Sequence, residues 1–202
     1  GYDILVRGQE ALSVINKKVK HIRQKLQTSE GDKKEVRGGV TYFDFDSVKD
    51  GQPVSDNGLV LHLRSSSLVQ GIRGRALRLY GKGSHAIIEP QLHLKHDWNC
   101  SLWVKCHSKQ SLLLFKNSKS ALALVQHGGG LGATKFGKGD FWFGQDLPLN
   151  KWVHLSFNYR GRQLDCWING VKSKSIDIAA FDFPGRILGD AKGKGTSVLI
   201  DE

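Results

Sequence analysis

The feature that most constrains the fold is a succession of short apolar segments, separated by turn residues, that begins at residue 39. The segments recur at intervals of about 8 to 12 residues, as is typical of antiparallel β-proteins. They lie at residues 40–45, 59–63, 76–80, 86–88, 101–106, 111–115, 121–126, 141–143, 152–159, 163–168, 171–178 and 197–200. The chain has 24 glycines and only four prolines among its 202 residues, which suits many tight turns. We therefore predict an all-β antiparallel sandwich.

The clearest hairpin joins residues 152–159 to residues 163–168, and Asn169-Gly170 then gives a strong turn signal. Side chains alternate between the two faces of a strand, so the apolar positions indicate the core. The residues predicted to point inward are Trp103, Leu155, Phe157, Leu164 and Ile168, and those predicted to point outward are Lys105, His154 and Lys172.

A glycine-rich stretch at 127–139 approximates a phosphate-binding loop. Gly139 stands where that motif needs Ser or Thr, and no helix follows. We predict a surface loop there.

The N-terminal part has a different pattern. Its apolar residues are spaced 7, 3, 4, 3 and 4 apart, which is typical of a heptad helix, and they are Leu5, Leu12, Ile15, Val19, Ile22 and Leu26. The sequence thus predicts a basic amphipathic helical arm and linker at 1–38 and a sandwich at 39–202. The helix could pack on a neighbouring segment, form a coiled coil, or bind an acidic membrane surface or a calmodulin-like groove.

Several motifs in residues 40–202 occur in the order seen in laminin-G-like domains of the concanavalin-A-like lectin/glucanase superfamily. The matching segments are Tyr42-Phe43-Asp44-Phe45-Asp46, Gly74-Arg75-Ala76-Leu77-Arg78-Leu79, Asn99 to Lys105, Lys151 to Tyr159, Cys166-Trp167-Ile168-Asn169-Gly170 and Leu199-Ile200-Asp201-Glu202. The chain resembles that family, and the resemblance implies a jelly roll of two curved sheets. The fold hosts lectins, adhesion modules and enzymes, so it does not itself define a function.

The basic arm, the free cysteines and the absence of a visible signal peptide also resemble the linker region of plant membrane calpains. That resemblance implies a non-catalytic regulatory module on the cytoplasmic face of a membrane-anchored cysteine protease, in contact with another domain of its own chain or with an acidic protein. The alternative is an extracellular laminin-G-like domain that binds glycans or matrix. The catalytic run E-x-D-x-E of related glucanases is not present, so this chain itself is predicted not to be an enzyme.

The cysteines and one sequence motif bear on the compartment in opposite ways. Cys100, Cys106 and Cys166 show no C-x-x-C spacing and are odd in number, so we predict buried free thiols, as in a reducing compartment. Asn99-Cys100-Ser101, in contrast, fits the N-glycosylation pattern of extracellular proteins.

The resemblance also implies a calcium site, because related sandwiches hold one ion with Asp side chains and carbonyl oxygens, which are the hard ligands that calcium prefers. The candidate ligands are Asp44 and Asp46 near the first strand and Asp201 on the closing strand.

A formal net charge of +11 is the remaining feature. The candidate basic surface residues are Arg73, Arg75, Arg78 and Lys82 in one cluster and Lys135 and Lys138 in another. Such clusters attract acidic lipids, acidic proteins or sulfated glycans. Nucleic acid is disfavoured, because the aromatic residues are predicted to lie in the core instead of among the basic residues.

Overall fold

The computed structural model describes residues 40–81, 83–92, 94, 96–107, 112–125, 130–189 and 197–201. The chain divides into two compact units, Gly1–Val40 and Thr41–Glu202. The predicted helical arm at 1–38 lies outside the described residues. Every regular element within them is a β-strand, and none of them forms a helix long and apolar enough to cross a membrane.

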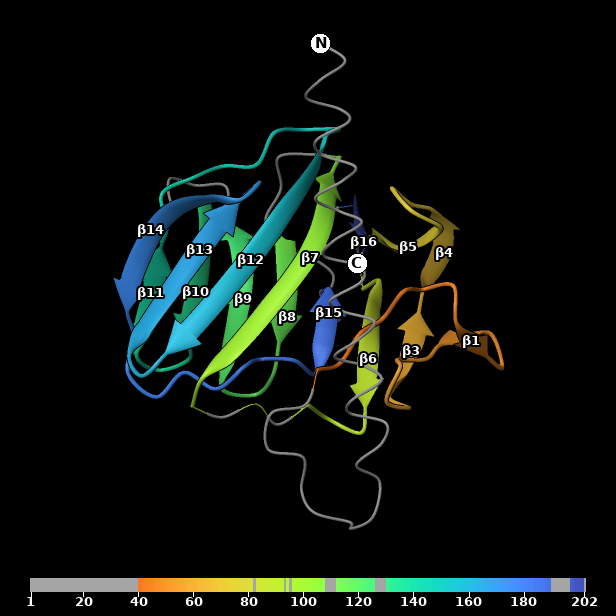
Figure 1. Cartoon of the computed structure of the whole chain (residues 1–202), viewed down its shortest axis with the longest axis horizontal. Helices are drawn as coiled ribbons and strands as arrows, with labels where there is room; N and C mark the ends of the chain where they lie inside the picture. The colour runs from red at the N-terminus through yellow and green to blue at the C-terminus, as the bar shows by residue number, and fades with distance from the viewer. Residues whose placement is uncertain are drawn as a thin grey trace, which may run out of the picture. The chain divides into compact units, whose positions relative to one another are not determined.

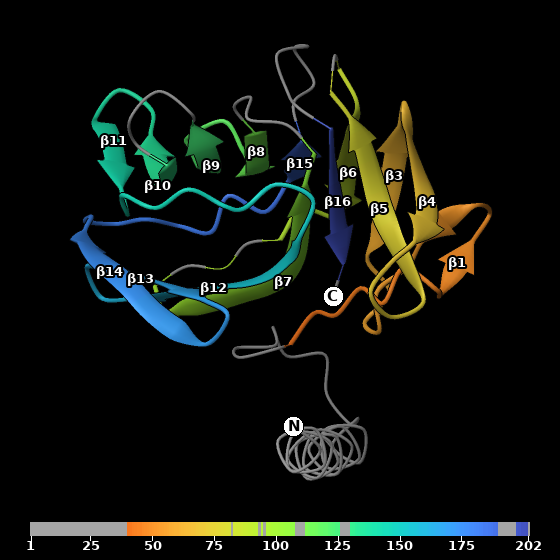
Figure 2. The same ribbon diagram turned by 90° about the horizontal axis from the view of Figure 1, so that it is seen from above.

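The second unit confirms the predicted all-β antiparallel sandwich (Figures 1 and 2). Its strands are β1 Val48–Lys49, β2 Gln52–Pro53, β3 Val60–Arg64, β4 Ser66–Gln70, β5 Arg75–Tyr80, β6 His85–Glu89, β7 Trp98–Cys106, β8 Leu112–Lys116, β9 Ser120–Val125, β10 Gly130–Lys135, β11 Gly139–Trp142, β12 Trp152–Arg160, β13 Gln163–Ile168, β14 Val171–Asp177, β15 Ile187–Gly189 and β16 Ser197–Asp201. One seven-stranded sheet, which we call sheet I, has the order β11-β10-β9-β8-β15-β6-β3. The other, sheet II, has the order β14-β13-β12-β7-β16-β5-β4.

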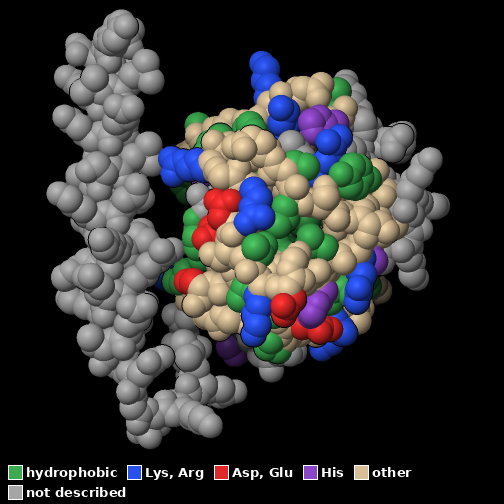
Figure 3. All heavy atoms as spheres, turned by 90° about the vertical axis from the view of Figure 1, so that its right-hand side faces the viewer, with side chains coloured by type: hydrophobic (Ala, Val, Ile, Leu, Met, Phe, Trp, Pro, Cys, Tyr) green, Lys and Arg blue, Asp and Glu red, His purple; other side chains and the backbone are tan. Residues whose placement is uncertain are grey.

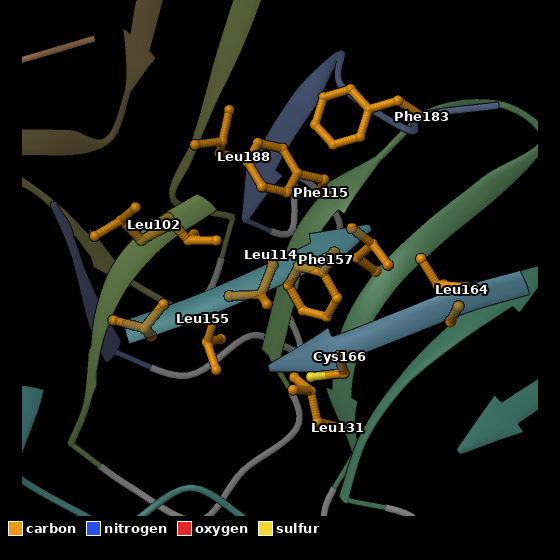
Figure 4. Packing of buried hydrophobic residues seen from close by; sticks show 14 of the residues in the cluster. Leu102, Leu114, Phe115, Leu131, Leu155, Phe157, Leu164, Cys166, Phe183 and Leu188 are labelled. Carbon is orange, nitrogen blue, oxygen red and sulfur yellow. The ribbon is translucent and has the colours of Figure 1, made fainter. Parts of the chain in front are cut away.

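The core lies between the two sheets, and strict alternation along the long strands builds it. In β12, Val153, Leu155, Phe157 and Tyr159 are buried, while the residues between them are partly exposed. Figure 4 shows Leu155 and Phe157 of sheet II packed with Leu114 and Leu131 of sheet I. Burial of these apolar side chains is the main favourable contribution to folding.

The rim of the sandwich is closed by a hydrogen-bonded aromatic cluster. The Tyr159 hydroxyl donates to the carbonyl oxygens of Gly161 and Ile178, at 2.8 and 3.0 Å, and accepts from the Phe181 amide at 3.1 Å. The Trp98 indole donates to the Phe181 carbonyl at 2.8 Å. These bonds satisfy buried polar groups and fasten the segment after β14 to the ends of β7 and β12.

The prediction that Trp103 points inward is wrong. Leu102 and Val104, its neighbours in β7, are buried, so Trp103 shares the opposite face with Lys105. The apolar character of the indole suggested burial, but the two-residue period of the strand decides its direction.

Two segment predictions are also corrected. Residues 40–45 form no strand: Phe45 has a φ of 55°, and the Asp44 carboxylate accepts from the amides of Asp46 and Ser47, at 3.0 and 2.8 Å, which produces a turn. The predicted loop at 127–139 contains β10. Glycine suits that strand because a side chain at Gly132 would overlap the indole of Trp142, its partner on β11.

Candidate functional site

The outer face of sheet II carries tryptophans among polar side chains, most of which are neutral. This face lies on β7, β12 and β13, which are in front of β8 to β11 in Figure 1. We call its outward-pointing residues the platform: Asn99, Ser101, Trp103, Lys105, Trp152, His154, Ser156, Asn158, Asp165 and Trp167. All ten are at least partly exposed. Outward tryptophans on an open sheet give flat apolar surfaces that solvent and ligands can reach.

The centre of the platform is formed by Trp103, His154 and Ser101. His154 is the register partner of Trp103, and their ring centroids are 5.1 Å apart. The Nε2 atom of His154 lies 2.7 Å from the Ser101 hydroxyl oxygen. Partial burial lowers the pKa of His154 from its ordinary value, which favours the neutral imidazole. The centre therefore presents an indole beside two uncharged hydrogen-bonding groups.

Trp167 lies on the other side of the platform. Its register partner on β12 is Ser156, which in turn is opposite Ser101 on β7. Beside it, the Asp165 carboxylate is 2.9 Å from the Lys172 ammonium. Burial raises the pKa of Asp165, but the Ser175 hydroxyl and Lys172 outweigh that effect and the pKa is lowered overall. Asp165 is therefore an ionised, paired carboxylate.

Asn99, the acceptor position of the N-glycosylation pattern, is exposed at the end of the platform. Its Nδ2 atom donates to Oδ1 of Asn158, its register partner, and lies 3.4 Å from the Ser156 hydroxyl. The amide that a glycan would occupy is therefore engaged with neighbouring side chains.

The predicted basic residues are mostly engaged locally. Arg75 pairs with Asp46 at 3.2 Å, and Arg78 lies 5.0 Å from the Tyr80 ring centroid. Lys135 donates to the carbonyl oxygens of Ala179 and Ala180, while Lys138 is exposed in the β10–β11 turn. On the face shown in Figure 3, basic and acidic side chains are interspersed.

Two further basic positions complete the predicted surface set. Arg73 is exposed in the turn before β5, and Lys82 lies outside the described residues. Binding of an acidic partner by any of these residues stays a prediction.

The three predicted calcium ligands are not assembled by the described side chains. Asp44 accepts from the turn amides, and Asp46 accepts from the Arg75 amide at 3.0 Å as well as from its side chain. Asp201 is paired with Trp103 in register, and its side chain is not among those described. Within the described part of the chain, no group of three or more His, Cys, Asp or Glu residues is placed to hold a metal ion.

The calcium site stays a prediction, and thermal unfolding tests it. An ion that binds only the folded chain raises the free energy of unfolding by about 2.7 kcal/mol when its free concentration is about 100 times its dissociation constant. If the site exists, 1 mM calcium raises the unfolding midpoint by several degrees relative to excess chelator. Identical midpoints with calcium and with chelator would contradict the prediction.

The three cysteines are unpaired, as predicted. Cys106 and Cys166 are buried and Cys100 is partly buried, and burial raises their pKa values to about 11, 12 and 12, respectively. Thiolates, not thiols, are the reactive species, so neutral thiols inside the sandwich are suited to packing instead of chemistry.

We expect the thiols of Cys106 and Cys166 to resist a disulfide reagent at pH 8 until the domain is unfolded, when all three cysteines react. Because the folded state holds these protons more tightly, the stabilisation from the thiols is complete below pH 9 and is lost as pH rises through 11 to 12. Absorbance of the released reagent, measured with and without denaturant, checks the expected resistance of the folded thiols. Rapid reaction of two or more thiols in the folded chain would contradict it.

The platform is the feature that the sequence interpretation missed. Trp103 is two residues from Lys105, and Trp167 is two residues from Asp165, so the alternation already placed both indoles on a polar face.

Comparisons with known proteins support the fold but identify no family. No known family model and no curated protein matches the chain. Among solved structures, the HCR/D W1238A mutant is 14% identical with a TM-score of 0.56, and the match covers 76% of this chain and 45% of that one. Trypanosoma rangeli sialidase in complex with a difluoro-nononic acid is 11% identical with a TM-score of 0.57, covering 83% and 31%.

A third match is domain 4 of AbnA, an extracellular GH43 arabinanase from Geobacillus stearothermophilus, in complex with arabinotriose. It is 19% identical, has a TM-score of 0.48, and covers 73% of this chain and 85% of that one. The chain spans less than half the length of the first two structures. The resemblance to plant membrane calpains stays a prediction. The first two likenesses show the fold alone, which is the β-sandwich described above.

Proposed function

We propose that residues 41–202 form a non-catalytic carbohydrate-binding domain, and that the platform is its binding face. The observation that carries the proposal is the outward placement of Trp103 on β7 and Trp167 on β13, the two strands that flank β12 in one open sheet, with Ser101, His154 and Ser156 between them. Apolar faces of sugar rings stack on indoles, while hydroxyl, imidazole and amide groups exchange hydrogen bonds with sugar hydroxyls.

The chemistry of the platform favours binding without hydrolysis. Glycoside hydrolysis generally uses two carboxyl groups on either side of the scissile bond, and one of them must carry a proton. Among the ten platform residues, Asp165 is the one carboxylate, and it is ionised and paired with Lys172. The ten platform residues therefore lack the second carboxyl group that this mechanism requires.

Affinity electrophoresis of the 202-residue chain through gels that contain arabinan, xylan, β-glucan, mannan, pectin or heparin tests the proposal. We expect at least one polysaccharide to retard the chain, and Trp103→Ala to remove the retardation. Phe136→Ala is the matched control, because Phe136 is 44% exposed on the turn after β10 and is not part of the platform. The proposal is wrong if no gel retards the chain, or if Trp103→Ala and Phe136→Ala behave alike.

A second candidate is an intracellular regulatory module, as the resemblance to plant membrane calpains implies. The observation that favours it is the presence of three unpaired thiols, which are unusual in secreted domains. Deletion of residues 39–202 from the parent protein tests it: the regulatory role requires a changed protease rate. An unchanged rate and an unchanged set of partners would exclude it.

A further inference from the structure

We infer that the platform selects an uncharged oligosaccharide that extends from Trp103 to Trp167, instead of an acidic glycan or a single sugar. This inference rests on the proposed carbohydrate-binding function and specifies the class of ligand.

The register separates the two indoles by more than one sugar ring. Trp167 on β13 is opposite Ser156 on β12, Ser156 is opposite Ser101 on β7, and Trp103 lies two residues beyond Ser101. Two inter-strand steps and two residues along a strand give a Cα separation of roughly 12 Å. A ligand that stacks on both indoles is therefore an oligosaccharide.

The surface between the indoles is polar and uncharged. Ser101 and His154 form one hydrogen-bonded pair, at 2.7 Å, and the Ser156 hydroxyl lies near the Asn99 amide, at 3.4 Å. Hydroxyl, imidazole and amide groups can both donate and accept hydrogen bonds, as sugar hydroxyls do. The middle of the platform thus matches a chain of sugar hydroxyls without requiring an ionic group.

The charge distribution distinguishes the platform from the rest of the molecule. The chain has a formal charge of +11, yet the ten platform residues include no arginine, the residue type best suited to bidentate binding of sulfate or carboxylate. Asp165 is paired with Lys172 at 2.9 Å, and partial burial lowers the pKa of His154, which favours its neutral form. Lys105, opposite Trp152, lies at one end of the platform, and the residue paired with Trp103 on β16 is the acidic Asp201.

Calorimetric titration of the 202-residue chain tests the inference. The probes are neutral hexasaccharides (arabino-, xylo-, cello- and mannohexaose), the corresponding monosaccharides, a heparin hexasaccharide and a hexagalacturonate. We expect a neutral hexasaccharide to bind most tightly and its monosaccharide to bind at least about tenfold more weakly. Its dissociation constant should change less than about twofold between 50 and 500 mM salt, because no ion pair forms.

Variants locate the binding. Trp103→Ala and Trp167→Ala should each weaken binding of the neutral hexasaccharide by at least about tenfold, as expected for aromatic anchors that a bound ligand covers. Phe136→Ala should leave the dissociation constant unchanged, and equal thermal midpoints of the variants confirm that they are folded.

The outcomes separate this inference from the proposed function. An acidic hexasaccharide could instead bind most tightly, in a salt-dependent manner that Trp103→Ala abolishes. In that case the proposed carbohydrate-binding function is supported, but the inference that the ligand is uncharged is wrong. If Trp167→Ala has no effect while Trp103→Ala abolishes binding, the inference that the ligand extends from Trp103 to Trp167 is wrong. If none of the probes binds, both the inference and the proposed function fail.

Discussion

Replacing Phe157 with alanine is expected to lower the free energy of unfolding by about 3–5 kcal/mol. The ring is completely buried in β12, lies 6.2 Å from the ring of Phe143, and is surrounded by leucines of both sheets (Figure 4). Truncation loses the transfer free energy of the ring and leaves a cavity that the two sheets cannot easily fill. In a domain of this size the unfolding midpoint should fall by roughly 10 °C, measured by calorimetry or circular dichroism.

The matched control for this variant is Trp103→Ala. It removes a larger side chain, but one on the outer face, so we expect it to cost much less than Phe157→Ala. If Trp103→Ala were the more destabilising of the two, the assignment of Phe157 to the core and of Trp103 to the platform would be wrong.

Alanine at Gly130 is expected to destabilise the domain by about 2–5 kcal/mol. Gly130 has a φ of 62°, a left-handed conformation that costs a residue with a side chain roughly 1–2 kcal/mol. In addition, the new methyl group would overlap the backbone of Gln145, which crosses directly over this glycine, and overpacking adds about 1–3 kcal/mol. Denaturant unfolding measures the sum.

Gly161→Ala separates the two contributions. Gly161 has a φ of 61°, but a methyl group there would meet no atom within 4 Å. Its cost should therefore be the conformational part alone, about 1–2 kcal/mol. Equal losses of unfolding free energy in Gly130→Ala and Gly161→Ala would show that the Gln145 backbone can move away from the new methyl group at no energetic cost.

Short-range features of the fold could be predicted from the sequence. The hairpin predicted at 152–159 and 163–168 is β12 and β13, because alternating apolar residues and a glycine turn determine it locally. In contrast, β15 was not predicted, since its three residues, Ile187–Gly189, are too few to show a period. The order of the strands in each sheet could not be predicted either, because pairing between segments far apart in the sequence is not encoded in the local residue pattern.

The surface could be predicted less well than the core. The pair between Arg75 and Asp46 joins residues 29 apart in sequence, and the carbonyl partners of Lys135 are 44 and 45 residues away. Composition indicates that a surface is basic, but only the fold shows which cations already have partners. The platform was missed for a different reason, because Trp103 was assigned by its apolar character and not by its position in the strand.

The positions of β15 and β16 have a consequence for synthesis. β15 lies between β8 and β6, and β16 lies between β7 and β5, so the last two strands that the structure describes are interior strands of the two sheets. While the ribosome is still producing residues 187–201, β5, β6, β7 and β8 each lack a neighbour and expose an unpaired edge. Sheet I therefore cannot be completed before β15 has been synthesised, nor sheet II before β16, and the edges exposed in that interval favour aggregation.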